Sequence, residues 1–375
     1  MSFDIVIVGL GAMGSAAAYH LAARGVRVLG LDRFTPPHTL GSSHGESRII
    51  REAYYEHPLY VPLVQRAYQL WDELAARTQQ QLFLQTGGLM IGPANGTLVR
   101  GALLSAHTHQ LTHEVLDATM LQRRYPAFHP TEEMVAVWEP RASILFPEKC
   151  IAAHLQLAQR HGATLHGEEF LVAWEQDGSS VQVTTNKGRY NASQLLIAAG
   201  AWLQTLIAEL ALPLHCTRQP LFWFEPRAHT EYFTPRNFPI YILEHAPERY
   251  IYGFPNLGTG CKAAIHHEGE TTQAEHVRRE VQAEEAAPVR SLLEKFLPHA
   301  SGPLLKTSVC MYTNTPDAHF LLDFHPQNKN VLLMSPCSGH GFKFSSALGA
   351  LAAELLCENQ TTFDLTPFRV QRLLA

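Results

Sequence analysis

The chain has 375 residues, of which 46% are hydrophobic and 17% are charged, and its net charge is −5. This composition excludes a disordered chain, and the length favours two domains over one. The charge argues against a nucleic-acid partner, because such proteins usually carry a surface rich in Lys and Arg.

A strand, a helix and a second strand are predicted at the start of the chain, in FDIVIVGLGAMGSAAAYHLAARGVRVLGLD. The β-branched run at residues 5–8 predicts a strand buried on both faces. Residues 12–24 predict a helix that stops at Gly25. Residues 26–31 predict the second buried strand, so the segment is a βαβ unit.

Three glycines mark the first turn of this unit. Gly9, Gly11 and Gly14 form G-x-G-x-x-G, a pattern that lets the backbone turn tightly and approach a pyrophosphate at the helix N-terminus. Asp32 follows the second strand, where a carboxylate can bind ribose hydroxyls. The complete set predicts dinucleotide binding, and the motif alone does not separate FAD from NAD.

The rest of the chain mixes strands and helices. Apolar residues recur at helical spacing over residues 58–80, and their aromatic members are interpreted as core packing. The segments that follow predict, in order, a β-hairpin turning at Asp177-Gly178, a strand entering a helix at Gly200, antiparallel strands at 218–226 and 249–255, a charged helix at about 273–296, and a strand, glycine loop and helix at 330–356. Nucleotide-type units at both ends imply one domain assembled from distant segments.

Two polar segments carry candidate anion-binding residues. Arg48 and Arg51 lie in GSSHGESRIIREAY, which is either a solvated basic loop or a site that binds carboxylates through guanidinium groups. Lys343 follows Gly339 and Gly341 in CSGHGFKFSS. Those glycines would let the backbone approach a flat ring, and the alternative is an ordinary strand-to-helix loop.

The sequence pattern alone leaves the roles of three further residues open. Cys310 in TSVCMYTNTPDAHF is either a buried apolar side chain or a reactive thiol. Lys262 is interpreted as an exposed lysine. His266 belongs to a His-His pair with no metal-ligand spacing around it, so no metal site is expected.

The cysteines and the apolar runs bear on location. Six scattered cysteines without a C-x-x-C pair form neither a disulfide framework nor a zinc pattern. The first predicted strand begins too early to leave room for a signal peptide, and no apolar run reaches the roughly 18–20 residues that span a bilayer. We therefore expect a cytoplasmic protein without a membrane partner.

Taken together, the motifs resemble the monomeric sarcosine oxidase family of FAD-dependent amine oxidases, which includes the N-methyltryptophan oxidases. The resemblance runs nearly end to end, and the segments that carry it are GLGAMGSAAAY, PPHTLGSSHGESRIIREAY, YVPLVQRAYQLWDEL, YGFP, VCMYTNTPDAHFLLD and SGHGFKFSS. The closing FDLTPFR leans toward the N-methyltryptophan branch.

The resemblance implies an α/β fold with two domains and FAD between them. It assigns residues 1–87, 149–215 and 320–375 to a discontinuous Rossmann-like FAD-binding domain. Residues 88–148 and 216–319 become a substrate domain with a mixed sheet. A monomer is expected.

The resemblance also implies roles for individual residues. Cys310 matches the cysteine that the family joins to the flavin as an 8α-S-cysteinyl thioether. Arg51 and Lys343 match the pair that holds the substrate carboxylate, and Lys262 matches the lysine at which oxygen is activated. The remaining matches are Arg48 near the flavin ring, His44 in the same loop, His266 at the active site, and Tyr252 and Tyr312 in the substrate pocket.

The implied reaction is oxidation of a secondary N-alkyl α-amino acid. A hydride equivalent leaves the N-alkyl carbon, water hydrolyses the imine to an aldehyde and a primary amino acid, and oxygen takes the electrons to give hydrogen peroxide. The rivals are an oxidase of a fructosyl amino acid, a cyclic imino acid such as pipecolate, or glycine; a dehydrogenase with a quinone or protein acceptor; and a binding or tRNA-modifying flavoprotein.

Departures from the family pattern concern specificity. The family's HHGDTR appears as SHGESR and its HAYGEG as EAYYEH, and both segments flank the substrate region. The spacing from Tyr252 to Lys262 is one residue shorter than in sarcosine oxidases. The match of Lys262 to the family's oxygen-activating lysine therefore depends on a one-residue gap in the alignment.

Overall fold

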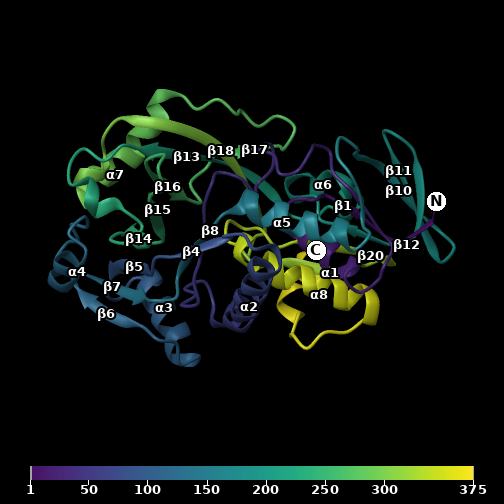
Figure 1. The fold of residues 1–375 in the computed structure, drawn as a ribbon, viewed down its shortest axis with the longest axis horizontal. Coiled ribbons are helices and arrows are strands. Elements are labelled where there is room, and N and C mark those ends of the chain that lie inside the picture. The colour runs from purple at the N-terminus through teal and green to yellow at the C-terminus, as the bar shows by residue number, and fades with distance from the viewer. Residues whose placement is uncertain (1, 375) are drawn as a thin grey trace.

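Two large β-sheets dominate the computed structural model, which describes residues 2–374. They lie toward opposite ends of the long axis of the molecule (Figure 1). A small antiparallel sheet adds β3 (Arg48–Ile50), β8 (Ser143–Leu145) and β4 (Phe83–Gln85). No helix among residues 2–374 is long and apolar enough to cross a membrane.

The first sheet is built from segments far apart in the sequence. Its order is β10-β11-β12-β1-β2-β9, with β20 added parallel to β12 and β19 paired to β20. The strands are β1 (Ser2–Val8), β2 (Val28–Leu31), β9 (Thr164–His166), β10 (Leu171–Asp177), β11 (Ser180–Thr185), β12 (Arg189–Ile197), β19 (Leu321–His325) and β20 (Asn328–Ser335). The apolar run that predicts β1 is buried because strands pair with it on both edges and helices cover it.

Helices from both ends of the chain pack beside this sheet. α1 (Ala12–Ala22) contacts α5 (Pro147–Arg160) and α8 (Ser345–Glu358), and α8 also contacts α2 (Val61–Thr78). The contact of α1 with α8 is close: a Cβ added to Gly349 would lie 2.5 Å from the Ala16 Cβ. A short helix, α6 (Leu203–Leu206), follows β12.

The second sheet is mainly antiparallel, with the order β17-β13-β16-β15-β14-β5-β7-β6 and β18 paired to β13. Its strands are β5 (Gly88–Pro93), β6 (Glu114–Asp117), β7 (Met134–Glu139), β13 (His215–Phe224), β14 (Ile240–Ala246), β15 (Arg249–Asn256), β16 (Cys261–His266), β17 (Thr271–Thr272) and β18 (Leu304–Asn314). Around it lie α3 (Thr97–Thr108), α4 (Ala118–Arg124) and α7 (Ala287–Phe296) (Figure 1).

The predicted elements are largely confirmed. The βαβ unit, the helix after residue 58, the hairpin at 177–178 and the strand, loop and helix near the C-terminus are all present. The charged helix expected over residues 273–296 is wrong in its first half. Residues 273–282 are not helical because the carbonyls of Arg278 and Glu280 accept hydrogen bonds from the buried Arg218 guanidinium, at 2.7 and 2.9 Å. Pro288 then favours a helix start near α7.

The glycine turn gives a test of the packing between β1 and α1. A Cβ at position 14 would lie 1.7 Å from the Gly9 carbonyl oxygen, whereas a Cβ at position 11 would meet nothing closer than the Ser43 hydroxyl at 3.9 Å. Gly14→Ala should therefore lower the free energy of unfolding by about 1–3 kcal/mol or more. Gly11→Ala is the control and should change it far less. Urea unfolding of both variants measures the difference, and equal stability would contradict the packing argument.

Candidate active site

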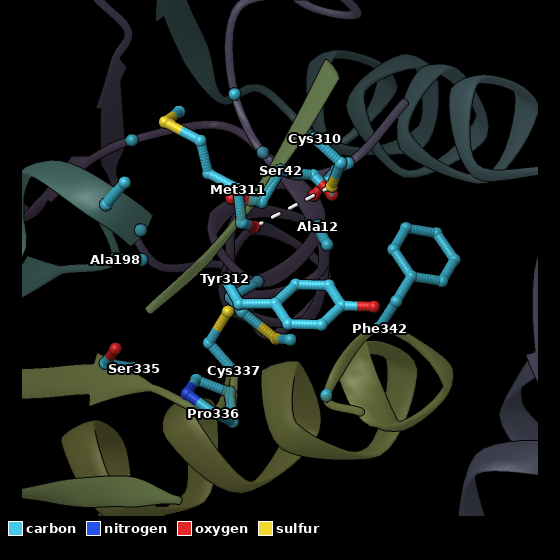
Figure 2. A pocket seen from close by; sticks show the side chains of 18 of the residues that line it. Ala12, Ser42, Ala198, Cys310, Met311, Tyr312, Ser335, Pro336, Cys337 and Phe342 are labelled. Atoms are coloured by element: carbon cyan, nitrogen blue, oxygen red, sulfur yellow. Dashed lines mark hydrogen bonds between the residues drawn. The ribbon is translucent and has the colours of Figure 1, made fainter. Parts of the chain in front are cut away.

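One cavity is lined by residues of both large sheets and of the segment that joins β2 to α2. The first sheet contributes the turn after β1 and the end of β2, and the second contributes side chains of β15, β16 and β18. Figure 2 shows Cys310, Met311 and Tyr312 of β18 around the cavity, together with Cys337 and Phe342 from the loop before α8. The site is therefore assembled at the junction of the two sheets.

The glycine turn forms one wall of the cavity. Gly9 has φ +93°, a left-handed conformation that glycine adopts without strain, and its N–H donates to the Leu31 carbonyl at 2.8 Å. Gly11 caps α1 with no side-chain hydrogen bond, and the first turn of α1 holds no acidic residue. The N–H groups of this helix end are thus free to bind an anion such as a pyrophosphate.

Asp32 organises the turn as well as lining the cavity. Its Oδ2 accepts from the Leu10 N–H at 2.7 Å, and its Oδ1 accepts from the Phe34 N–H at 2.9 Å. The carboxylate therefore connects the end of β2 to the loop after β1. Oxygen lone pairs remain on this side chain for a ribose hydroxyl.

The second sheet presents its site residues on one face because they recur at even spacing on β15, β16 and β18. Cys310 and Tyr312 are two residues apart on β18, and Lys262 and His266 are four apart on β16. Tyr252 on β15 lies opposite Ala264 of β16. His266 Nδ1 contacts the Tyr312 hydroxyl at 3.1 Å.

Lys262 is a buried cation, so its interpretation as an exposed lysine is wrong. Its side chain is 2% exposed, and Nζ donates to the Gly45 carbonyl at 2.7 Å and to the Ser47 carbonyl and hydroxyl at 3.1 Å each. Burial and the charge of Arg48 hold the pKa of Lys262 well below its ordinary value. Lys262 does not itself line the cavity, and it contacts the loop at Gly45 and Ser47, between the lining residues Ser43 and Arg48.

Arg51 is also buried, which excludes the solvated basic loop. Its Nη2 donates to Glu56 Oε2 at 2.6 Å and its Nη1 to the Ala53 carbonyl at 2.8 Å, while Nε has no hydrogen-bond partner among the described residues. Burial favours the neutral form of Glu56, but the charges of Arg51, His340 and Lys343 and the hydrogen bond from Arg51 together outweigh it and keep the Glu56 pKa below its ordinary value. The rings of Tyr54 and Tyr55 lie on the guanidinium, at 4.5 and 4.8 Å.

Lys343 ends a buried chain of hydrogen bonds. His340 Nε2 lies 2.9 Å from the Ala318 carbonyl, which can only accept, so Nε2 carries the hydrogen and Nδ1 accepts from the Tyr54 hydroxyl at 2.6 Å. Lys343 Nζ donates to the Tyr54 hydroxyl at 3.4 Å and to the His340 carbonyl at 2.7 Å. Burial and the charge of Arg51 lower the pKa of Lys343 to about 7.

Arg48 connects the loop after β2 to Cys310. Its Nη2 lies 3.4 Å from Cys310 Sγ and donates to the Ser42 carbonyl at 2.9 Å. His44 is buried outside the cavity lining, with Nδ1 3.4 Å from the Ser308 hydroxyl. Burial, together with the charge of Arg48, lowers the pKa of His44 to about 3, so its imidazole is neutral.

Most of the predicted site residues meet at this cavity. Its lining includes Gly9, Gly11, Asp32, Arg48, Arg51, Tyr252, His266, Cys310, Tyr312, Gly339, Gly341 and Lys343, whereas Gly14, His44 and Lys262 lie outside it. Within the described ranges, no group of three or more His, Cys, Asp or Glu residues is placed to hold a metal ion.

Sequence reasoning missed three residues that shape the site. Glu56 pairs with Arg51, and Tyr54 and His340 support Lys343. Tyr54 and His340 stand inside the segments singled out for Arg51 and Lys343, and Glu56 lies two residues beyond the first of them, so proximity to those cations was the available signal. Nothing in a loop sequence says which way such side chains turn.

Comparison with known proteins agrees with this geometry. The family model described as FAD dependent oxidoreductase matches residues 4–355. The monomeric sarcosine oxidase of Streptomyces avermitilis is 42% identical over 100% of this chain and 98% of its own length. The N-methyl-L-tryptophan oxidase of Salmonella arizonae is 36% identical over 99% of both chains.

The chain belongs to the monomeric sarcosine oxidase and N-methyl-L-tryptophan oxidase family. It is therefore an FAD-dependent oxidase acting on CH–NH groups. The structure of NikD, an unusual amino acid oxidase, has a TM-score of 0.86 at 24% identity and covers 98% of this chain and 97% of its own. Glycine oxidase from Geobacillus kaustophilus has a TM-score of 0.83 at 19% identity, with full coverage of both chains. These two structures share the fold.

The residues present fit FAD, the cofactor of this family. The uncapped end of α1 and the glycine turn suit the pyrophosphate. Two buried hydroxyls in the lining, those of Ser42 and Ser335, have no hydrogen-bond partner among the described residues and can serve a polar ligand.

The Arg51–Glu56 pair yields a stability prediction. Glu56→Ala leaves a buried guanidinium without its carboxylate, and we expect a loss of roughly 2–5 kcal/mol in the free energy of unfolding. The control is Glu114→Ala, which breaks an ion pair of similar length (2.7 Å) to Arg124 whose side chains are 52% and 37% exposed. That change should cost less than about 1 kcal/mol. Similar losses in both variants, measured by urea unfolding, would show that Arg51 does not depend on Glu56.

Proposed function

We propose that the protein oxidises N-methyl α-amino acids, such as sarcosine or N-methyl-L-tryptophan. The N-methyl amino acid, oxygen and water become the primary amino acid, formaldehyde and hydrogen peroxide. The observation that carries this proposal is the convergence of two buried cations, Arg51 and Lys343, at the cavity. The relatives named for these two substrates support it.

Arg51 and Lys343 suit a substrate carboxylate. A planar guanidinium binds a carboxylate through two parallel N–H groups, and Arg51 Nε has no other partner among the described residues. Lys343 adds a second charge, and its Nζ lies 5.1 Å from the centre of the same Tyr54 ring that Arg51 contacts. Fixing the carboxylate orients the N-methyl carbon, and this positioning is the catalytic contribution of the pair.

FAD supplies the redox chemistry: when bound, it accepts the hydride equivalent of amine oxidation and returns the electrons to oxygen. We propose that Gly9, Gly11 and Asp32 hold its pyrophosphate and ribose, and that Cys310 binds it covalently. His266 and Tyr312 hydrogen-bond to each other and, with Tyr252, shape the substrate side of the cavity. A substrate amine that reacts in its neutral form needs no general base from these residues.

We propose that Lys262 promotes the reaction of the reduced flavin with oxygen. The first electron added to oxygen creates negative charge, and a preorganised ammonium group nearby stabilises it. Lys262→Met should therefore slow flavin reoxidation far more than flavin reduction.

The two large sheets suggest a division of the chain into two domains. We infer that residues 1–87, 149–215 and 320–375 form the FAD-binding domain and that 88–148 and 216–319 form the substrate domain. The name of the monomeric relatives favours a monomer.

An oxygen-electrode assay with a substrate panel tests the proposal. Peroxide release with sarcosine or N-methyl-L-tryptophan, and not with glycine or pipecolate, is the expected result. Reduction of an artificial dye without oxygen uptake would instead indicate a dehydrogenase.

The carboxylate site predicts a pH dependence of ligand binding. Methoxyacetate, in which oxygen replaces the nitrogen of sarcosine, should bind more weakly as pH rises through about 7, because Lys343 then loses its proton. Lys343→Met should abolish that dependence. Arg51→Ala should weaken binding on the order of 30-fold or more at every pH, since losing one partner of a desolvated charge pair costs about 2–5 kcal/mol. Lys329→Met, at an exposed position, is the control. Titration of the flavin absorbance measures affinity, and an unchanged Kd in Arg51→Ala would refute the assignment.

Covalent attachment predicts that acid-precipitated protein stays yellow and that a peptide containing Cys310 carries the mass of FAD. Cys310→Ala should release the flavin into the supernatant. Cys337→Ala changes another thiol of the same cavity and should keep it bound. Flavin that is released from the wild-type protein would rule out the thioether.

A further inference from the structure

The loop that receives the Lys262 ammonium group has an unusual backbone. Gly45 and Glu46 are consecutive residues with φ of +92° and +69°. Glycine adopts this conformation freely, but Glu46 has a Cβ and does so at a cost. A residue held in this region persists only where the surroundings fix it.

Glu148 fixes this loop from the first turn of α5. A single carboxylate oxygen, Oε1, accepts from the Gly45 N–H at 2.7 Å and from the Glu46 N–H at 3.1 Å. Glu148 is half-buried and lies about a hundred residues further along the chain, so this is a tertiary contact.

Glu148 and Lys262 bind opposite ends of the same peptide group. The peptide that joins Gly45 to Glu46 donates its N–H to Glu148, and its carbonyl oxygen accepts from Lys262 Nζ at 2.7 Å. The dipole of this peptide therefore points from the ammonium group to the carboxylate, and each hydrogen bond polarises the other. The next residue, Ser47, completes the set of acceptors around Nζ and also accepts from Arg48 Nη1 at 2.8 Å.

We propose that Glu148 is a positioning residue for the oxygen reaction: its Oε1 holds the Gly45–Glu46 peptide in the orientation that seats the Lys262 ammonium group. The inference rests on the proposed role of Lys262. Besides this peptide, Nζ contacts the Ser47 oxygens and lies 4.9 and 5.2 Å from the rings of Phe254 and Trp223, and the charge of Arg48 acts on it. A peptide that turned away would remove the shortest hydrogen bond of the ammonium group.

Two substitutions separate position from charge. Glu148→Gln keeps an oxygen that can accept from both N–H groups and removes the charge. Glu148→Asp keeps the charge and shortens the side chain by one methylene, so the oxygen falls short of the loop.

Stopped-flow kinetics of the flavin-loaded variants measures each half of the cycle. A misplacement of about 1 Å can cost 10²-fold in rate, and we expect Glu148→Asp to slow reoxidation by about tenfold or more while anaerobic reduction by sarcosine stays within about threefold. Glu148→Gln should stay within about threefold in both. If Glu148→Asp reoxidises at the wild-type rate, or if Glu148→Gln loses as much as Glu148→Asp, the positioning role is overturned.

A double-mutant cycle with Lys262→Met tests whether Glu148 acts through Lys262. In that background, Glu148→Asp should cause no further loss in reoxidation, and a full additional loss would overturn the proposal.

Amide hydrogen exchange of the peptide covering residues 42–48 gives a readout independent of turnover. Exchange should increase in Glu148→Asp and not in Glu148→Gln, and equal exchange in both variants would contradict the holding contact. A wild-type protein that does not reoxidise with oxygen would refute the proposed function, whereas the exchange comparison would still test the contact.

Discussion

The site depends on four basic side chains where the two sheets meet, three of them buried and the fourth, that of Arg48, half-buried. Arg48, Arg51, Lys262 and Lys343 lie there together, and among the ion pairs of the described residues only Arg51 has a carboxylate partner. Removing an ion from water costs several kcal/mol, so each charge needs compensation. Backbone carbonyls supply much of it: those of residues 42, 45, 47, 53 and 340 all accept from these groups. Carbonyl dipoles solvate a cation without neutralising it, and the cavity therefore stays attractive to anions.

This arrangement explains why the chain between β2 and α2 is largely irregular, with only the three-residue strand β3 and one short helical turn. In a regular helix or strand, the carbonyls already accept hydrogen bonds from backbone N–H groups of the same helix or sheet. The loop instead turns them toward the cations, and it is anchored from outside by carboxylates: Glu148 binds N–H groups 45 and 46, and Glu139 binds N–H groups 52 and 53. The backbone N–H groups of this segment bind acidic side chains, and its carbonyls bind basic ones. The segment therefore links the carboxylates of α5 and β7 to the basic side chains of the site.

The sequence determines some parts of this site more visibly than others. The glycine turn and Asp32 were predictable because backbone sterics demand fixed spacing. The roles expected for Cys310 and Tyr312 came from the family resemblance, and the structure places both on β18, two residues apart. By contrast, the burial of Lys262 was missed because a lysine in a β-strand gives no local sign that carbonyls from another segment will surround it. The helix over residues 273–282 was predicted wrongly for the same reason: the distant Arg218 takes the carbonyls that a helix would use.

The order of the first sheet bears on how the protein is made. β12 binds β1 along one edge, while β11 binds its residues 189–192 and β20 its residues 195–197, and β20 begins only at Asn328. At about 5–20 residues per second, synthesis of the intervening chain takes on the order of tens of seconds. During that time residues 195–197 of β12 lack their partner strand on that edge, and the face of α1 that later receives α8 stays uncovered. The nascent chain must therefore be protected from aggregation until about its last eighth emerges from the ribosome, and the first sheet, although its first strand is made first, is completed last.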